Sequence, residues 1–295
     1  MSATHSHSHG LPSGVGWEQL APGQRKGPKS GPANMASVQR RYGQTLRGVY
    51  GAISAEAKRA VVERDFFGLR SNVEQLSDSA FDPSDLTPSA FSPDDPATNH
   101  QEFMDWLHEE QRRGILETFT KDNNTYVRKA SNRGVKYAEK ELRKAGYDVD
   151  SEDVAAVFNR PAEANQLRLL FQRNYDQLED VTADTASSIS RVLSEGFGQG
   201  KNPTEIGRSI TKQTELAKTR STRIARYEVM NAHSTFTRRR YERAGVEKVE
   251  VLGSNPCTEI CAPIIAGNPY PLGEVPNGGP PFHPNCVDCL SPVMV

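Results

Sequence analysis

Residues 161–200 read PAEANQLRLLFQRNYDQLEDVTADTASSISRVLSEGFGQG and carry the longest helical pattern of the chain. The positions that would share one helix face are Leu167, Phe171, Asn174, Leu178, Val181, Thr185, Ser188, Val192 and Glu195. A helix of about 35 residues, rising about 1.5 Å per residue, is a rod on the order of 50 Å long. Because the period is close to 3.5 residues, we expect this rod either to pack along another long helix, in this chain or in a neighbouring subunit, or to be an ordinary bundle helix.

The residues after this rod predict a second helical region. The GFGQG run at residues 196–200 ends the rod. Asn202, Pro203 and Glu205 then form a helix start, with an asparagine cap, a proline at the first position and a glutamate at the third. A further helix is predicted over residues 216–244, with Gly245 as its end.

Arginines are concentrated on the helix predicted at residues 216–244. They are Arg220, Arg223, Arg226, Arg238, Arg239, Arg240 and Arg243. Arginine forks suit phosphates and carboxylates, so these side chains could contact packaged DNA or an acidic surface on a portal or capsid subunit. The third interpretation is internal salt bridges to Asp and Glu residues of the rod.

All four cysteines of the chain lie in one C-terminal segment. CTEIC at residues 257–261 is followed by a Gly/Pro-rich loop and then by HPNCVDC at residues 283–289. Two such pairs can close a tetrahedron around zinc, so zinc is the expected cofactor. Five side chains are candidates for four ligand positions: Cys257, Cys261, His283, Cys286 and Cys289. Reduced thiols and two disulfides remain the alternatives to a zinc site.

Short strands flank this cysteine segment. Val249 and Val251 alternate with charged residues and predict a strand, and residues 287–295 form a second strand-like piece. The simplest arrangement pairs these two strands, with the metal holding the loop between them.

The N-terminal half predicts helices separated by breaks. Residues 1–33 are a basic, disordered arm, residues 34–77 hold an N-terminal helix, and residues 78–99 are a linker rich in Pro, Asp and Ser. Residues 100–200 form a long-helix region, and residues 201–295 form a C-terminal domain. Within the long-helix region, helices are predicted over residues 100–120 and 126–145, and Ser151 is expected to cap a short helix that ends at Phe158. The fold class is therefore mainly α: an extended helical bundle with one rod-like helix and a small, zinc-stapled α+β domain at the C-terminus.

Composition limits the possible functions of the 295 residues. The formal net charge is −1, so attraction to nucleic acid would have to come from local patches. No apolar run approaches the ~20 residues of a membrane span, and no signal peptide is expected at the polar N-terminus. We expect the protein to be made in a reducing cytoplasm and kept there, or inside a particle assembled there.

The sequence does not favour an enzyme. His233 is the only histidine on the Arg-rich helix, and no nucleophile or well-placed carboxylate lies near it in sequence, so we expect a partly buried structural histidine. No Gly-rich phosphate loop followed by Lys-Ser/Thr is present, which excludes ATP-driven packaging of that type.

Residues 174–292 resemble the minor head proteins of tailed viruses, the Mu F-like head morphogenesis family. The likeness includes GFGQG at residues 196–200, the helix around residues 220–231, and PPFHPNC at residues 280–286. The last cysteine pair departs from the family, which often has one residue between these cysteines, whereas Val287 and Asp288 stand here.

The resemblance implies a structural protein of the virion head, present in a few copies near the portal vertex, that acts in head assembly or DNA delivery. Its implied partners are the portal or major capsid protein and packaged DNA, with self-association through the long helix as a further expectation. It would be found in the host cytoplasm during assembly. A zinc-dependent nuclease or toxin-like effector and a stand-alone DNA-binding module are the alternatives.

Overall fold

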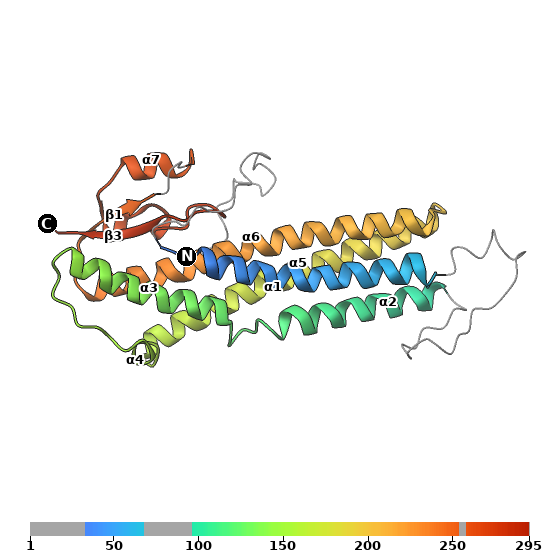
Figure 1. Cartoon of the computed structure of the whole chain (residues 1–295), viewed down its shortest axis with the longest axis horizontal. Helices are drawn as coiled ribbons and strands as arrows, with labels where there is room; N and C mark the ends of the chain where they lie inside the picture. Colours follow the sequence, from blue (N-terminus) through green and yellow to red (C-terminus); the bar gives the residue numbers. More distant parts are fainter. Residues whose placement is uncertain (1–32, 68–95, 254–257, 295) are drawn as a thin grey trace, which may run out of the picture.

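The chain folds as an extended helical bundle with a small α+β part at its C-terminal end, which confirms the predicted fold class (Figure 1). The computed structural model describes residues 33–67, 96–253 and 258–294. The bundle runs along the long axis of the molecule, and the sheet lies against one end of it. Within the described residues, no helix is both long and apolar enough to cross a membrane.

The bounds of the elements are as follows. The helices are α1 (Ala36–Lys58), α2 (Pro96–Gln111), α3 (Thr125–Lys144), α4 (Val154–Phe158), α5 (Pro161–Gly198), α6 (Pro203–Arg243) and α7 (Cys261–Ala266). One π-helical turn follows α1 (Arg59–Glu63) and another follows α2 (Arg112–Leu116). The strands are β1 (Lys248–Leu252), β2 (Tyr270–Pro271) and β3 (Cys289–Val293), and short 3-10 turns cover Leu272–Glu274 and Pro276–Gly278.

Two long helices form the axis of the bundle. The predicted rod is α5, with 38 residues, and α6 is longer still, with 41. Asn202 caps α6 as predicted, because its Oδ1 accepts a hydrogen bond of 3.0 Å from Glu205 N. The start predicted at residue 216 is wrong, since residues 208–243 contain no glycine or proline and α6 continues unbroken from the Asn202 cap.

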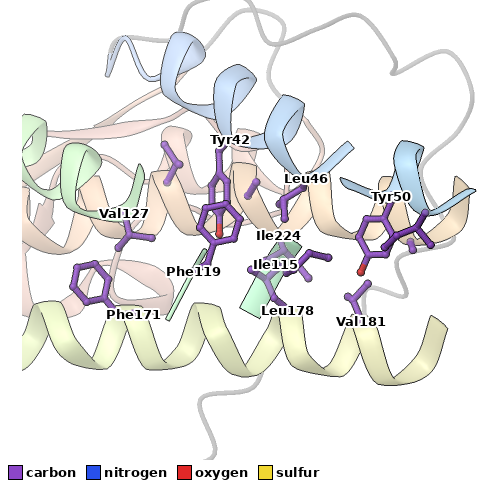
Figure 2. Close-up of a cluster of buried hydrophobic side chains, with 14 of the residues drawn as sticks. Tyr42, Leu46, Tyr50, Ile115, Phe119, Val127, Phe171, Leu178, Val181 and Ile224 are labelled. Atoms are coloured by element: carbon purple, nitrogen blue, oxygen red, sulfur yellow. The ribbon is translucent and has the colours of Figure 1, made fainter. Parts of the chain in front are cut away.

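The apolar stripe of α5 is covered by helices of the same chain. α6 packs along α5, and α1 and α2 lie beside them (Figure 1). Figure 2 shows Tyr42, Leu46 and Tyr50 of α1 directed toward Leu178 and Val181 of α5. All five are at most 1% exposed. Burial of such a side chain contributes about 1.5–3 kcal/mol each, so this shared core holds the long helices together.

A buried polar cluster lies inside this apolar core. The Tyr42 hydroxyl donates to Asn174 Oδ1 over 2.6 Å, and Asn124 Nδ2 donates to the same oxygen over 2.7 Å. Asn124 is also the N-cap of α3, where its Oδ1 accepts from Tyr126 N and Val127 N. The cluster therefore ties α1, α3 and α5 together at one register.

Helix α3 approaches α6 very closely at Gly134. A Cβ built on Gly134 would overlap the carbonyl oxygen of His233, so only glycine allows the two backbones to lie this near each other. Thr237 Oγ1 donates to Gly134 O over 3.2 Å at the same point.

Several predicted boundaries shift. The short helix α4 is capped by Asp153, whose Oδ1 accepts from Ala155 N over 3.1 Å, and not by Ser151. Ser151 instead accepts a hydrogen bond of 2.9 Å from Arg143. Residues 96–99, predicted as the end of the linker, form the first turn of α2. The arm at residues 1–32 and residues 68–95 lie outside the described residues.

The C-terminal part has its own core. The predicted pairing of the two strands is confirmed, and the pair is antiparallel, with Val249 opposite Pro292 and Val251 opposite Leu290. Strand β2, which was not predicted, adds to the other edge of β1. Tyr241 of α6 is fully buried in this core and donates to Leu290 O over 3.1 Å, so α6 joins the two parts of the molecule.

Candidate metal centre

The structure brings together three of the five predicted ligands. The donor atoms of Cys261, His283 and Cys286 all lie within 4.8 Å of one another. Both cysteines are 1% exposed, and His283 is half-buried. Thiolates and imidazoles are the usual ligands of structural zinc, and these three side chains come from two segments that a metal would join. The cluster can therefore hold a metal ion.

Local backbone bonds place the three donors. Cys261 begins α7, and its N–H donates to Thr258 O over 3.1 Å. Cys286 N donates to His283 O over 2.9 Å, which closes a tight turn and puts the imidazole and the thiol on one side of it. These backbone hydrogen bonds therefore help to place the donor atom of Cys261 near those of His283 and Cys286.

Two arginines of α6 hold the loop that carries His283 and Cys286. Arg226 Nη1 donates to Asn285 Oδ1 over 3.1 Å, and Arg238 Nη1 donates to Gly278 O over 3.0 Å. Gly278 lies in the left-handed region, with φ +76°, where glycine is strongly favoured. The Arg-rich helix therefore positions this loop, a role that was not predicted for its arginines.

The neighbours of the Cys261 thiol perturb its ionisation. Contact with Cys286, together with burial, raises the pKa of this thiol above its usual range. A coordinating divalent cation would favour the thiolate instead. The three described cysteines are free thiols, so the disulfide alternative is not observed among them.

The remaining two predicted ligands are not in this cluster. Cys289 is directed elsewhere: its Sγ lies 2.9 Å from the Tyr137 hydroxyl, and burial raises the pKa of Cys289 to about 12. Cys289 also belongs to the core of the helical bundle, whereas Cys261 and Cys286 belong to the C-terminal core. Cys257 lies outside the described residues, so its role stays a prediction.

The prediction missed Asp288. This side chain is 2% exposed, and the Cys286 thiol donates to its Oδ2 over 3.4 Å. The HPNCVD segment could have indicated it, because Asp288 is only two residues from Cys286.

Most of the predicted contact arginines form ion pairs within the chain. Arg220 pairs with Asp184 at 2.7 Å, and Arg239 and Arg243 pair with Glu163 at 2.5 and 2.7 Å, so three arginines of α6 reach acids of α5. This confirms the internal salt bridges that were one of the three interpretations.

Two more of these arginines also lie near acids of the same chain. Arg240 Nε lies 3.7 Å from Glu152, and Arg238 pairs with Glu242 at 3.0 Å. Contact of the seven arginines with DNA or with another protein stays a prediction.

Arg226 differs from these paired arginines. Burial lowers its pKa, and the neighbouring charges of Arg47 and Arg223 lower it further. Arg47 reaches α6 from α1, where its Nη1 donates to Thr222 Oγ1 over 3.3 Å. Three guanidinium groups therefore gather where α1, α6 and the Cys/His loop meet.

His233 is a fully buried structural residue. Within the described part of the chain, neither of its ring nitrogens has a hydrogen-bond partner. Burial lowers the pKa of His233 to about 3, with Arg133 as a smaller cause, so the ring is neutral near pH 7. Glu228, the acidic residue of α6 that precedes His233 by five positions, pairs with Arg173 of α5 at 3.2 Å.

Comparisons of this chain with protein-family models, with curated proteins and with solved structures give no match. The functional argument therefore rests on the residues themselves.

Proposed function

We propose that the chain is a minor structural protein of a tailed-virus head, which acts near the portal vertex in head morphogenesis and in DNA packaging or delivery. The observation that carries the proposal is the set of motifs in residues 174–292, from GFGQG to PPFHPNC, and their resemblance to the Mu F-like family. An elongated bundle that ends in a small Cys/His part supports it, because such a shape can reach across neighbouring subunits (Figure 1).

The proposal includes a structural zinc ion. Cys261, His283 and Cys286 would supply three ligands, and the metal would close the loop between α7 and β3. The core around this loop is small, so a metal is a physically reasonable way to stabilise it. Elemental analysis of protein purified under reducing conditions should find about one zinc per chain, and an absence of zinc would contradict this part.

The proposed partner of the arginines of α6 is a portal or major capsid protein rather than packaged DNA. Pairing of Arg220, Arg239 and Arg243 with acids of α5 neutralises much of the positive charge of α6. The net charge of −1 offers no broad positive field that would hold a duplex. Self-association stays possible only through surfaces other than the α5 stripe, because helices of the same chain cover that stripe.

Mass spectrometry of purified virus particles tests the proposed function. We expect the chain in the particles at a few copies per head. Its absence from particles, combined with hydrolysis of nucleic acid by the purified protein, would replace the proposal with a zinc-dependent nuclease or toxin-like effector. Absence combined with tight, salt-sensitive DNA binding would favour a stand-alone DNA-binding module.

A further inference from the structure

Three arginines lie close together where α6 meets α1 and the Cys/His loop. Arg226 Nη1 of α6 donates to Asn285 Oδ1 of the loop over 3.1 Å. Arg47 Nη1 of α1 donates to Thr222 Oγ1 over 3.3 Å, one helical turn before Arg226. Arg223 follows Thr222 directly, and all three arginines are half-buried. Burial lowers the pKa of Arg226, and the charges of Arg47 and Arg223 lower it further. The three guanidinium groups therefore form one cluster.

Close packing of α1 on α6 fixes Arg47 in this cluster. Gln39 Nε2 of α1 donates to Arg226 O over 3.2 Å. One turn later on α1, a Cβ built on Gly43 would lie 3.1 Å from Thr222 Cγ2 and 3.2 Å from Arg47 Nη1. The absence of a side chain at Gly43 thus leaves room for Arg47 to reach α6. The cluster is held in place by neutral groups of α1, α6 and the loop.

The surroundings of the cluster contain no counter-charge. No Asp or Glu occurs in the three segments that meet there, residues 33–55, 216–227 and 275–287. The next acid of α6, Glu228, is fully buried and pairs with Arg173 of α5. Within the described part of the chain, Arg47 and Arg226 form no ion pair. Half-buried positive charges that lie close together repel one another, so a bound anion would stabilise the cluster.

The chemistry of the cluster fits a phosphate group. Guanidinium groups offer flat pairs of N–H donors that match the oxygens of phosphate and carboxylate, and they stay charged at any physiological pH. A phosphate monoester carries a charge of about −1.5 to −2 near pH 7. It therefore offsets more of the charge of three arginines than a single carboxylate or a phosphodiester does.

The cations next to the cluster on α6 are paired with acids. Lys218 pairs with Glu215, and Arg220 pairs with Asp184. A DNA duplex presents a row of phosphates, and a protein that holds it neutralises several of them. A single half-buried cluster flanked by paired cations fits one isolated phosphate group better than a DNA backbone.

We propose that Arg47, Arg223 and Arg226 form a binding site for a phosphate dianion, either inorganic phosphate or the terminal phosphate of a small organic molecule. The site lies at the junction of α1, α6 and the Cys/His loop. The inference goes beyond the proposed function, and it depends neither on the virion assignment nor on a bound metal. It adds Arg47, which was not among the predicted contact residues.

Isothermal titration calorimetry of the full-length protein with inorganic phosphate tests the site, in a buffer free of phosphate and sulfate. We expect one phosphate per chain with a Kd below about 1 mM. Arg47→Gln should weaken binding at least ~10-fold, because hydrogen bonds between charged groups are strong and one guanidinium is lost. Arg226→Gln should weaken binding as much. Since Arg226 also holds Asn285, Arg47→Gln is the decisive variant if Arg226→Gln disturbs the loop.

Two further variants separate recognition of the phosphate from a general loss of charge. Arg47→Lys keeps the charge but loses the planar pair of donors, so its affinity should fall between those of wild type and Arg47→Gln. Arg208→Gln removes an exposed charge of α6 about 22 Å along the helix from Arg223. Its affinity should equal that of the wild type, because salt screens charges at this distance.

Adenosine monophosphate and a short DNA duplex without terminal phosphates distinguish the sources of the phosphate. Binding of the nucleotide at least as tight as that of inorganic phosphate, and weakened by Arg47→Gln, would support the site and assign it to a phosphorylated small molecule. Binding of inorganic phosphate alone would support the site and assign it to the free ion.

Three outcomes would overturn the inference. The first is a wild type that binds no phosphate, and the second is wild-type affinity in both Arg47→Gln and Arg226→Gln. The third is displacement of phosphate by the unphosphorylated duplex at lower concentration than by the nucleotide, which would identify a nucleic-acid contact instead. None of these outcomes depends on whether the chain is found in virus particles, so the proposed function is tested separately.

Discussion

Single buried polar residues set the register of the bundle. Tyr42, Asn124 and Asn174 form hydrogen bonds with one another between three helices, and each is at most 1% exposed. A helix that slid by one residue would leave these groups without partners, at a cost of about 1–3 kcal/mol for each group. Specific residues therefore select one packing from the many that an apolar stripe allows.

Asn124→Ala should destabilise the protein more than Asn202→Ala does. Both asparagines cap a helix, and loss of a cap costs about 1 kcal/mol. Only Asn124 is buried, and its loss also removes hydrogen bonds to Tyr42 and Asn174, for an expected total of about 2–4 kcal/mol. Urea unfolding followed by circular dichroism measures both variants. Equal losses would mean that the buried cluster adds nothing beyond the cap.

His233 should make stability depend on pH. Its pKa is lowered to about 3 in the folded chain, against about 6.5 when unfolded, so between these values the unfolded chain binds more protons. Stability therefore falls as pH drops below about 6.5, by at most about 1.4 kcal/mol per pH unit.

His233→Leu should flatten the dependence of the unfolding free energy on pH between about 6.5 and 4, because leucine does not titrate. The control is His108→Gln, an exposed position on α2, which should leave the slope unchanged. An unaltered slope in His233→Leu would show that another group causes the acid sensitivity.

At the scale of elements, α5 is stabilised by its partners rather than by its own sequence. Its stripe is filled by α6, α1 and α2, with Leu178 and Val181 in the middle (Figure 2). Helix α3 also lies directly against α6, because Gly134 has no Cβ that would overlap the α6 backbone. The long helices are thus one cooperative unit.

Leu178→Asp should destabilise this unit severely, whereas Leu169→Asp should not. Both leucines lie on α5, but Leu178 is 1% exposed and Leu169 is 47% exposed. Burial of an unpaired charge and loss of the leucine should together cost about 4 kcal/mol or more at residue 178, against less than about 0.5 kcal/mol at residue 169. Thermal unfolding followed by circular dichroism compares them, and similar melting temperatures would refute the packing role of the stripe.

At the scale of the whole molecule, the bundle and the C-terminal part have separate cores joined by α6. Tyr241 lies in the C-terminal core, and Val229 lies in the core of the bundle. A change confined to the Cys/His loop should therefore affect one end of the molecule while the long helices persist.

Removal of the proposed metal tests this independence. A chelator should increase amide hydrogen exchange in residues 258–294 and leave the middle of α5 and α6 protected, because a structural metal stabilises the segment it closes. Cys261→Ser should show the increased exchange without chelator and no further change with it. Exchange that rises equally in α5 would show that the two cores unfold together.

The proposed contact of the α6 arginines with a partner protein can be tested at positions that are not paired with buried acids. Reversal of Arg239 or Arg240 would disturb pairs with buried Glu163 and Glu139, so a joint change of Arg220 and Arg223 to glutamate is better suited. The Arg220–Asp184 pair is exposed and contributes little to stability. We expect weak duplex binding by the wild type at physiological salt, and failure of the double variant to co-purify with heads, with exposed Arg208→Glu as the control on α6.

Salt-sensitive DNA binding by the wild type, with a slope that flattens in the double variant while head incorporation stays normal, would identify DNA as the target instead.

Local sequence signals were sufficient to predict several helix starts and the strand β1. The Asn202 cap, the Pro161 and Pro203 starts and the valine alternation of β1 are read over a few residues, and each was predicted at its observed place. The cysteine and histidine spacing likewise predicted a possible metal site: His283 and Cys286 are close in sequence, and the fold brings Cys261 to them from the other side of the Gly/Pro-rich loop. Ser151 was a wrong cap because Asp153 offers an equivalent oxygen two residues later.

Only the tertiary structure decided which groups meet across the chain. Whether the α5 stripe packs in this chain or against a neighbour depends on the paths of α1 and α6, which no local pattern contains. The separation of Cys289 from Cys286 and the contact of Asp288 with Cys286 depend on the path of the chain as it enters β3. Arg239 and Arg243 of α6 pair with Glu163 of α5 for a similar reason. These residues are far apart in the sequence, and only the packing of α5 on α6 brings their side chains together.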